Sequence, residues 1–344
     1  MNRLQPAELR RAVTRADVAR YAGVSSADGL LRRQQRAETR RPATAARVRE
    51  AIAVLGYRPN LSARALKRGS NQMLGLVVHD SSNPFFASFA LEITVEAARR
   101  GYVVLMINSR ADVEMEQRAL DDLVGRQVDG VILASTQPLV FGQRHQTSDV
   151  PAVLIDSSVA VPGHSSLGPD ALNAARVVVE HLIEVHGHTS IGIVIGNDGS
   201  DLDRREEGWQ IALRAAGLPD GPIARAPFSR EGGFRGGQQL LAASERPTAI
   251  FASSDLQAVG LLKAIREHDL SVPADIAVVS FDGTAESEYC SPPLTVVRQP
   301  IHAMAMRAVD RLLAKDVRLG VHEKFDMELV VRESCGCPRV KEVV

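Results

Sequence analysis

The sequence predicts an α/β protein in which a small helical head precedes a large body of doubly wound, mostly parallel sheets. The first observation is charge: residues 1–72 hold 16 Lys and Arg against 5 Asp and Glu, whereas the remaining 272 residues hold 25 against 36. The second is periodicity, because apolar residues recur at helical spacing in the head and in short runs between amphipathic stretches from Met73 onward. A basic head on an acidic body is typical of a polyanion-binding module joined to a second functional unit.

Composition narrows the class of protein. A chain of 344 residues is long enough for two or three domains, and its three cysteines are too few for a disulfide framework, so we expect a reducing, cytoplasmic setting. No apolar run follows the N-terminal arginines and no apolar span has membrane-crossing length, so we expect a soluble protein that is neither exported nor membrane-bound. Cys335-Gly336-Cys337 resembles a redox or metal pair, but no second ligand pair lies near it in the sequence. We therefore expect no metal site and no cofactor.

Three helices are expected in the head. Thr14 can cap a short helix over 15–21, and Gly23 can supply the positive φ of a tight turn. Ser25 can then cap a second helix, and a third is expected over 44–55. Helix, glycine-containing turn and helix form the signature of a helix-turn-helix, whose second helix enters the major groove of DNA. The residues expected to face inward are Val18, Ala19 and Ala22 in the first helix and Ala45, Val48, Ile52 and Leu55 in the third.

Two blocks of the head resemble the LacI/GalR (lactose-repressor) family of bacterial regulators. The blocks are Val13-Thr14-x-x-Asp17-Val18-Ala19-x-x-Ala22-Gly23-Val24-Ser25 and Val48-Arg49-x-Ala51-Ile52-x-x-Leu55-Gly56-Tyr57-x-Pro59-Asn60. The resemblance extends over residues 13–338 and implies a body of two Rossmann-like lobes that close on a small ligand, as in periplasmic sugar-binding proteins. The segments that it implies are a basic tail (1–12), a helix-turn-helix DNA-binding domain (13–59), a hinge helix and linker (60–70), a two-lobed effector-binding and dimerisation domain (71–338) and a tail (339–344).

The resemblance also implies how the head contacts DNA. Ala63-Arg64-x-Leu66 is similar to the family's hinge helix, which folds on the operator and inserts a leucine into the minor groove, and Leu66 occupies the matching position. Taken without the resemblance, residues 60–68 also fit an ordinary linker. The DNA-contacting residues that the resemblance implies are Thr14, Arg15, Ser25, Ser26, Ala27, Asn60, Ala63, Arg64 and Leu66.

Residues 28–41 depart from the family pattern. The family has a recognition helix of the form T-V-S-x-V-x-N, whereas this chain has Asp28-Gly29-Leu30-Leu31-Arg32-Arg33-Gln34. A back-translation of residues 28–41, read one nucleotide later, gives T-V-S-Y-V-V-N-N-G-P-R-R-V, which fits that seven-position pattern in order. The family register resumes at Pro42 without a change in spacing. We therefore hypothesise that residues 28–41 are a frame-shifted copy of the recognition helix and its following loop.

The residues of this segment are expected to lower the stability of the head. The family register places valines at three positions where this chain has Gly29, Arg32 and Arg33. A glycine inside a helix costs about 1 kcal/mol, and the loss of a core valine or the burial of an unpaired arginine costs about 1–3 kcal/mol each. A head of this size has only roughly 3–5 kcal/mol of stability to lose. The alternative is that Arg32, Arg33 and Arg36 form a non-specific phosphate-binding stripe.

The body is expected to alternate strands and helices, with a break near residues 156–168 and later return strands that favour two lobes with crossing connections. Ligands of such sheets bind beyond the carboxyl ends of the strands. The expected strands cover 74–78, 103–107, 130–134, 152–155, 191–195, 249–252 and 276–281. The expected helices cover 85–100, 113–126, 171–186, 203–216, 232–243, 255–268 and 301–314.

Polar and aromatic residues follow several of these strands. Phe85 and Phe86 begin a helix after the first body strand, where a ring can stack on a sugar or base, although at least one ring is expected to belong to the core. Arg205 stands where the family grips its effector, and its fork suits paired hydroxyls or a carboxylate; a surface salt bridge is the alternative. Ser254 departs from the Asn that family members often have there, which leaves that contact in doubt. The implied effector-binding residues are Asn83, Phe85, Phe86, Asp156, Arg205, Ser254, Asp255 and Asp282.

A nucleotide-dependent enzyme is the rival class. Gly232-Gly233-Phe234-Arg235-Gly236-Gly237 superficially resembles a phosphate loop, but it lacks the preceding buried strand, the G-x-G-x-x-G spacing and a Lys-Ser/Thr pair. Its glycines are expected to open a helix that packs closely on a neighbour. No G-x-S-x-G motif occurs, and the nine histidines do not group with acids at metal spacing. An exported sugar-binding receptor would need a signal peptide in place of the basic head. We therefore expect no catalytic activity.

These observations predict a bacterial, cytoplasmic, nucleoid-associated transcriptional regulator, in the simplest case a repressor. A small effector, which the resemblance implies to be a sugar or sugar derivative, would control its affinity for double-stranded operator DNA. The alternative is a sugar-binding protein with a degenerate head that no longer binds DNA specifically. Two chains are expected to pair through the body as a homodimer for a palindromic operator. Nothing after Pro338 resembles an apolar heptad repeat, so no tetramer through the C-terminus is expected.

Overall fold

The computed structural model describes residues 13–24, 42–58, 69–135, 150–157, 160–196, 203–314 and 320–338. The chain divides into two compact units, Met1–Asn71 (the head) and Gln72–Val344 (the body). Within the described ranges, no helix combines the length and the apolar composition that a bilayer span requires.

Two helices form the described part of the head, α1 (Arg15–Tyr21) and α2 (Pro42–Leu55). Thr14 caps α1 as predicted: its hydroxyl accepts the Asp17 amide at 3.4 Å, and the Asp17 carboxylate accepts the Thr14 amide at 2.9 Å. Gly23 adopts the predicted positive φ, at +62°. The predicted second helix and the segment 28–41 lie outside the described residues.

A small apolar core joins α1 to α2. Val18, Ala19 and Ala22 are buried, which confirms the predicted inner face of α1. On α2, Val48, Ile52 and Leu55 are half-buried against this core. Ala45 is half-buried too, whereas Ala51 is fully buried although the apolar spacing did not single it out.

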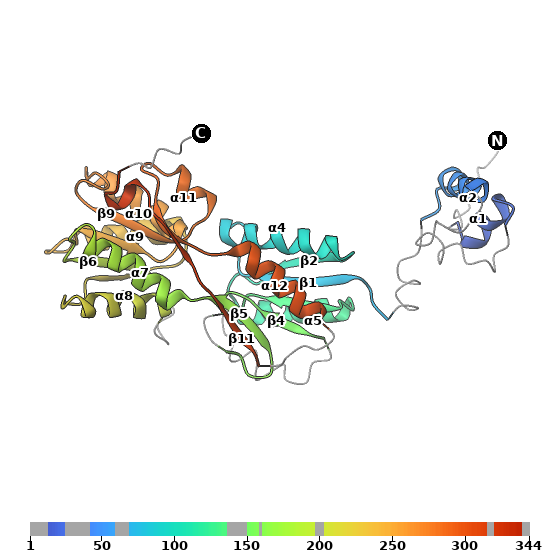
Figure 1. The fold of residues 1–344 in the computed structure, drawn as a ribbon, viewed down its shortest axis with the longest axis horizontal. Helices are drawn as coiled ribbons and strands as arrows, with labels where there is room; N and C mark the ends of the chain where they lie inside the picture. Colours follow the sequence, from blue (N-terminus) through green and yellow to red (C-terminus); the bar gives the residue numbers. More distant parts are fainter. Residues whose placement is uncertain are drawn as a thin grey trace, which may run out of the picture. The chain divides into compact units, whose positions relative to one another are not determined.

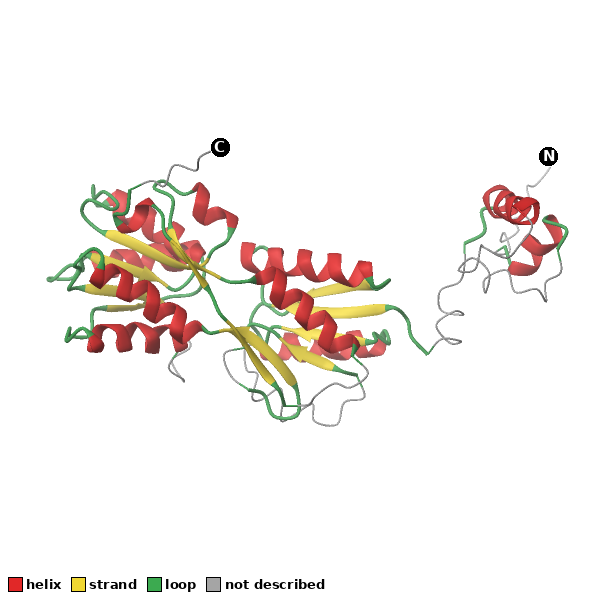
Figure 2. Cartoon of the chain, in the orientation of Figure 1, coloured by secondary structure: helices red, strands yellow, loops and turns green. Residues whose placement is uncertain are grey.

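The body consists of two six-stranded sheets, one in each lobe (Figures 1 and 2). All strand pairs are parallel except β10 with β12. The sheet of the first lobe runs in the order β11 (His322–Phe325), β5 (Ser165–Pro169), β4 (Ala152–Leu154), β3 (Gly130–Leu133), β1 (Met73–Val78) and β2 (Val103–Asn108). The sheet of the second lobe runs in the order β12 (Glu328–Val330), β10 (Thr295–Arg298), β9 (Ala277–Asp282), β8 (Ala249–Ala252), β6 (Ile191–Ile195) and β7 (Ile223–Arg225).

Helices cover both faces of each sheet, as Figure 1 shows, so the central strands are continuous apolar runs. In the first lobe, α4 (Pro84–Arg99) and α12 (Ile301–Leu313) cover one face and α5 (Val113–Gly125) covers the other. In the second lobe, α7 (Ala171–Glu184) and α8 (Arg204–Ala215) lie opposite α9 (Arg230–Leu241) and α10 (Asp255–Glu267). The shorter elements are α11 (Ala285–Tyr289) and the 3₁₀ helix η3 (Glu333–Cys335).

The glycine-rich run lies inside α9, which packs on α10 with direct backbone contact. A Cβ added to Gly233 would lie 2.0 Å from the Gln257 carbonyl oxygen, and one added to Gly260 would lie 1.9 Å from the Arg230 carbonyl oxygen. Only glycine permits this approach. The structure confirms the predicted close helix packing, and the phosphate-loop alternative does not hold because these residues are helical.

Three connections cross between the lobes, at Asp170, at Gln299–Pro300 and at Asp326–Met327. The break predicted near residues 156–168 is wrong in one respect, because it contains most of β5, which belongs to the sheet of the first lobe. That strand has the sequence SSLGP, and its buried serines carry no apolar signal. The short strands β7, β10, β11 and β12 were likewise not predicted, whereas the seven predicted strands and seven predicted helices of the body are all present.

Candidate functional site

The second lobe holds Arg205 in one orientation at the carboxyl ends of its strands. The Asp203 carboxylate caps α8 by accepting the Arg205 backbone N–H at 2.8 Å. The same carboxylate accepts the guanidinium Nε–H at 2.9 Å and an Nη2–H at 2.6 Å, while Nη1 donates to the Ser253 carbonyl at 2.9 Å. Three of the five guanidinium N–H groups therefore have partners among the described residues, and two can donate to a ligand.

Two aromatic rings flank this guanidinium. The Arg205 Cζ atom lies 4.6 Å from the Phe228 ring centroid and 5.3 Å from that of Phe281. Phe281 is 1% exposed, whereas Phe228 is 39% exposed in the loop before α9. Gly196, which follows β6, makes room for this ring, because a Cβ there would lie 2.5 Å from it. Phe228 is thus an open aromatic surface next to fixed N–H donors, an arrangement on which a sugar ring can stack.

Asp156 is the first-lobe residue that lies close to Arg205. It follows β4, its φ is +55°, and its side chain is accessible to solvent. Nevertheless, burial among surrounding protein atoms raises the pKa of its carboxyl to about 6, against the opposing effect of the Arg205 charge. Because Arg205 acts on this carboxyl from the second lobe, the two residues lie near each other across the lobes.

Asp282 and Gln299 complete the second-lobe side. Asp282 ends β9 with φ +103°, and the Gln299 Nε2–H group donates to its Oδ1 atom at 2.9 Å. Burial, and then the charge of Asp255, raise the pKa of Asp282 well above its usual value, with Arg205 opposing them. The buried Oε1 atom of Gln299 has no hydrogen-bond partner among the described residues. It is therefore an acceptor available to a ligand hydroxyl.

His79 supplies a comparable atom in the first lobe. It follows β1, its ring packs edge-on against Phe86 at 5.2 Å, and it hydrogen-bonds the Ala134 backbone. Burial lowers the pKa of His79, so its ring is neutral at pH 7. Its buried Nε2 atom has no partner within the described ranges. We define the interlobe site as His79, Asp156, Asp203, Arg205, Phe228, Asp282 and Gln299.

The other predicted effector residues have structural tasks. Asn83 caps α4 by accepting the Phe85 amide at 3.0 Å. Phe85 and Phe86, 4% and 6% exposed, belong to the core of the first lobe.

At the start of α10, Ser254 accepts the Gln257 amide at 3.3 Å. Asp255 is 1% exposed and accepts hydrogen bonds from the Ser280 hydroxyl and from the amide and hydroxyl of Thr284. Asp255 therefore holds β9 and the following loop in place beside Asp282.

Four members of the interlobe site were not predicted from the sequence: His79, Asp203, Phe228 and Gln299. Asp203 carried a usable signal, since it occupies the cap position two residues before an expected ligand-binding arginine. Gln299 and His79 each follow a strand directly, which is the position that sheet topology favours for ligand contacts. Phe228 carried no such signal, because the three-residue strand β7 before it is too short to recognise.

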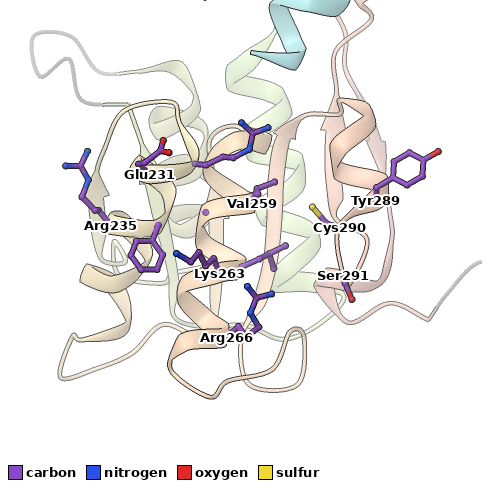
Figure 3. A pocket seen from close by; sticks show the side chains of 12 residues that line it. Glu231, Arg235, Val259, Lys263, Arg266, Tyr289, Cys290 and Ser291 are labelled. Carbon is purple, nitrogen blue, oxygen red and sulfur yellow. The ribbon is translucent and has the colours of Figure 1, made fainter. Parts of the chain in front are cut away.

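A pocket lies within the second lobe, away from Arg205 (Figure 3). It has a volume of about 540 Å³, and it contains none of the interlobe residues. Its lining comes from α9, α10 and the end of α11, and Tyr289 at its edge is 86% exposed. Because its lining belongs to one lobe, a ligand bound there would not bridge the lobes, and we do not assign the effector to it. The lining residues labelled in Figure 3 are Glu231, Arg235, Val259, Lys263, Arg266, Tyr289, Cys290 and Ser291.

In the head, the structure places two of the predicted DNA-contacting residues. Arg15 is exposed in the first turn of α1, where it is free to approach a phosphate. Thr14 forms the cap of that helix, with its hydroxyl donating to Asp17 Oδ2 at 2.6 Å. The remaining predicted residues lie outside the described ranges: Ser25, Ser26, Ala27, Asn60, Ala63, Arg64 and Leu66.

Comparison with known proteins agrees with this architecture. Residues 179–335 match the family of periplasmic binding protein-like domains. The chain is 34% identical to the ribose operon repressor of Escherichia coli strain K12 over 310 residues, which cover 87% of this chain and 92% of that protein. The crystal structure of the Lac repressor dimer bound to operator and the anti-inducer ONPF superposes with a TM-score of 0.82 and 29% identity, covering 94% of this chain and 99% of that one. The transcriptional regulator CelR in complex with cellobiose gives a TM-score of 0.68 at 30% identity, with 94% and 99% coverage.

These relatives span nearly the full length of this chain, and they match both its head and its two-lobed body. The capped head helix and the body of two mostly parallel sheets agree with these relatives. The chain therefore belongs to the LacI family of transcriptional regulators.

Proposed function

We propose that this protein is a DNA-binding transcriptional repressor whose effector is an uncharged, hydroxyl-rich small molecule, a sugar or sugar derivative, bound at the interlobe site. The observation that carries the proposal is the arrangement of Arg205 and Asp282 in one lobe opposite Asp156 in the other. Fixed N–H donors, carboxylate acceptors and an open aromatic ring are the groups that recognise sugar hydroxyls and a sugar face.

The charge of the site supports an uncharged effector. Arg205 has three carboxyl groups around it, those of Asp156, Asp203 and Asp282. Burial opposes its charge, but the neighbouring carboxylates outweigh burial and raise the pKa of the guanidinium above its usual range. An effector phosphate would add negative charge to a cluster that already has an excess of it. The names of two relatives, a ribose operon repressor and a regulator bound to cellobiose, agree with a sugar.

The two lobes give the effector a means of control. A ligand that contacts Asp156 from one lobe and Arg205 from the other favours the closed arrangement by its differential affinity for it. The three connections at Asp170, Gln299–Pro300 and Asp326–Met327 are the segments about which the lobes can rotate. Closure would then change the affinity of the head for DNA through residues 60–70, the proposed hinge. As a regulator of transcription the protein would act on the chromosome, in the bacterial cytoplasm, and the proposal includes no catalytic step.

A dimer fits one face of the first lobe. β2 is an edge strand of its sheet, and Met106, which points to the same side as Val104 and α4, is 46% exposed. On α4, which contacts β2, Leu91 and Val95 are 62% and 39% exposed. Exposed apolar residues next to a free sheet edge are typical of a subunit interface. We therefore place part of the homodimer interface on this apolar face of β2 and α4.

The alternative is a ligand-binding protein whose head no longer reads an operator, and residues 28–41 favour it. Gly29, Arg32 and Arg33 stand where the family has apolar recognition-helix residues. The test is selection of genomic DNA fragments by the chain as written and by a chain carrying T-V-S-Y-V-V-N-N-G-P-R-R-V in this segment, at low and moderate salt. Purely phosphate-driven binding falls steeply as salt rises. Enrichment of one promoter by both proteins would refute the frame-shift hypothesis, whereas enrichment by the restored protein alone would confirm it.

A further inference from the structure

The C-terminal segment of the body brings two cysteines to two histidines of α7 and its following turn. Cys335 and Cys337 lie at the end of the segment that follows β12, and His181 and His186 lie at the C-terminal end of α7. The four ligand atoms, two Nε2 and two Sγ, all lie within 4.8 Å of one another. About 150 residues separate the two pairs, which is why sequence spacing alone predicted no metal site.

Three distances in this cluster match those of a tetrahedral metal site. Zn²⁺ binds Cys sulfur at about 2.3 Å and His nitrogen at about 2.0–2.1 Å, so ligand atoms at tetrahedral corners lie about 3.3–3.8 Å apart. His181 Nε2 lies 3.4 Å from Cys335 Sγ and 3.8 Å from Cys337 Sγ, and His186 Nε2 lies 3.3 Å from Cys337 Sγ. Three of the six ligand–ligand distances thus fall in the range that a bound zinc ion imposes.

The local backbone shapes this arrangement. Gly336 has φ +106°, a conformation that lets the side chains on either side of it turn toward the histidines. A Cβ at Gly336 would lie 3.1 Å from His186 Nδ1, so glycine also keeps the histidine side free.

Hydrogen bonds from neighbouring groups hold the sulfur of Cys335 in place. Cys335 is 1% exposed, and its Sγ atom accepts a hydrogen bond from the Thr295 hydroxyl at 3.1 Å. The backbone N–H of Cys337 also donates to it. Hydrogen bonds to a ligating sulfur are a common feature of protein metal sites.

We propose that His181, His186, Cys335 and Cys337 form a structural Zn²⁺ site that fastens the C-terminal segment to α7. Four protein ligands in tetrahedral positions close the coordination sphere, which is typical of structural rather than catalytic zinc. Two thiolates and two imidazoles favour zinc over the hard cations Mg²⁺ and Ca²⁺, which prefer oxygen.

The site has a mechanical consequence for the second lobe. The cysteines follow β12, the strand that the chain enters after its third crossing between the lobes at Asp326–Met327. Zinc would anchor that segment to α7 and close a loop of about 150 residues, so it would add to the stability of the second lobe. No member of the interlobe site is a ligand, and zinc binding is therefore independent of the effector.

The test is zinc content and affinity of the full chain, purified under reducing conditions. We expect one zinc ion per chain by elemental analysis. We expect its affinity, measured with a competing chelator, to fall at least about 100-fold in His186→Ala and in Cys337→Ser, since loss of outer-shell partners alone costs about 10–100-fold. Both side chains are half-buried, which makes these variants less disruptive than changes at Cys335. The matched controls are His188→Ala and Cys290→Ser, and both variants should keep the zinc. His188 lies two residues from His186 and is hydrogen-bonded to Thr248.

Cobalt provides a second, spectroscopic readout of the same site. The unaltered chain loaded with Co²⁺ should show thiolate-to-cobalt charge transfer and the intense visible bands of a tetrahedral ion. These bands should weaken in Cys337→Ser and persist in Cys290→Ser. A chain that takes up neither zinc nor cobalt, or that binds them equally well after His186→Ala and Cys337→Ser, would overturn the proposal.

Discussion

Asp156, at the end of β4 in the first lobe, lies within electrostatic reach of Arg205, in the first turn of α8 in the second lobe. Each residue shifts the proton affinity of the other, although they belong to different lobes. A ligand that bridges them is sensed by both lobes at once. The relationship therefore links the recognition of the effector to the lobe closure proposed above.

Asp203→Asn should weaken effector binding by about 10-fold or more. The Asp203 carboxylate accepts hydrogen bonds from both the Nε–H and an Nη2–H of Arg205, one on each oxygen. The asparagine amide has only one oxygen, so it can accept only one of these two bonds in the same geometry. A lost hydrogen bond to a charged group is worth about 1.5–3 kcal/mol. Titration calorimetry measures the affinity, and the matched control is Glu207→Gln, which pairs with Arg204 on the surface and should leave the affinity unchanged. Equal affinities in the two variants would mean that Arg205 needs no fixed orientation.

Asp156→Asn should raise stability in a pH-dependent way. The native carboxyl holds its proton up to a pKa of about 6, whereas the unfolded carboxyl releases it near 3.8. The native state therefore binds more protons between these values, and the free energy of unfolding falls as the pH rises through them. Asparagine cannot ionise and escapes this loss. The difference in Tm between variant and parent should grow from about pH 4 to about pH 6 and stay constant above it.

The same carboxyl should make effector binding depend on pH. The ionised form accepts charge-assisted hydrogen bonds on both oxygens, whereas protonation turns one oxygen into a donor, so the affinity of the parent protein should fall as the pH drops below about 6. In Asp156→Asn the affinity should be weaker at neutral pH and flat across this range. A pH dependence that survives the substitution would assign the titrating group elsewhere, with Asp282 as the next residue to substitute.

Phe228→Ala should reduce effector affinity by about 3–10-fold with little change in stability. Its ring is 39% exposed, and aromatic stacking is worth about 0.5–1.5 kcal/mol. Phe281→Ala gives the opposite pattern, because that ring is 1% exposed and its loss from the core costs about 3–5 kcal/mol. Calorimetry and thermal unfolding of both variants separate the two effects. Undiminished affinity in Phe228→Ala would show that this ring does not contact the effector.

Leu91→Asp should convert the dimer to a monomer at micromolar concentration. The side chain is 62% exposed on the apolar face of β2 and α4, and a buried unpaired carboxylate would be costly there. Ile211→Asp, at a 37% exposed position on α8 of the second lobe, is the matched control. Sedimentation velocity distinguishes the species, and a dimer that persists in Leu91→Asp would place the interface on another face.

Much of the fold could be predicted from the sequence because its signals are local. The run Ile191–Ile195 is apolar at every position except Gly192, and Thr14 and Asp17 sit at the spacing of a capping box. β5 was not predicted because Ser165 and Ser166 are polar, and their burial depends on the neighbouring elements and not on their own residue type. One strand on each side, β11 and β4, and the contacting helix α12 determine its place.

The site was less predictable, for a different reason. Asp156, Arg205 and Asp282 came from a family resemblance combined with strand ends, and the structure brings all three together. Phe228 depends on the path of a loop, and the approach of His181 to Cys335 depends on how the last strand returns to the second lobe. Contacts between residues so far apart in the chain leave no mark on local spacing.

The most direct test of the proposed function is calorimetric titration of the unaltered protein and of Arg205→Ala. The titrants are uncharged sugars and nucleosides together with their phosphorylated forms, and Arg204→Ala, exposed one residue earlier, serves as the control. The interlobe site predicts that an uncharged hydroxyl-rich compound binds the parent and Arg204→Ala equally and binds Arg205→Ala at least about 10-fold more weakly. Tighter binding of a phosphorylated compound, or equal affinity in Arg205→Ala, would contradict the assignment of the effector to this site.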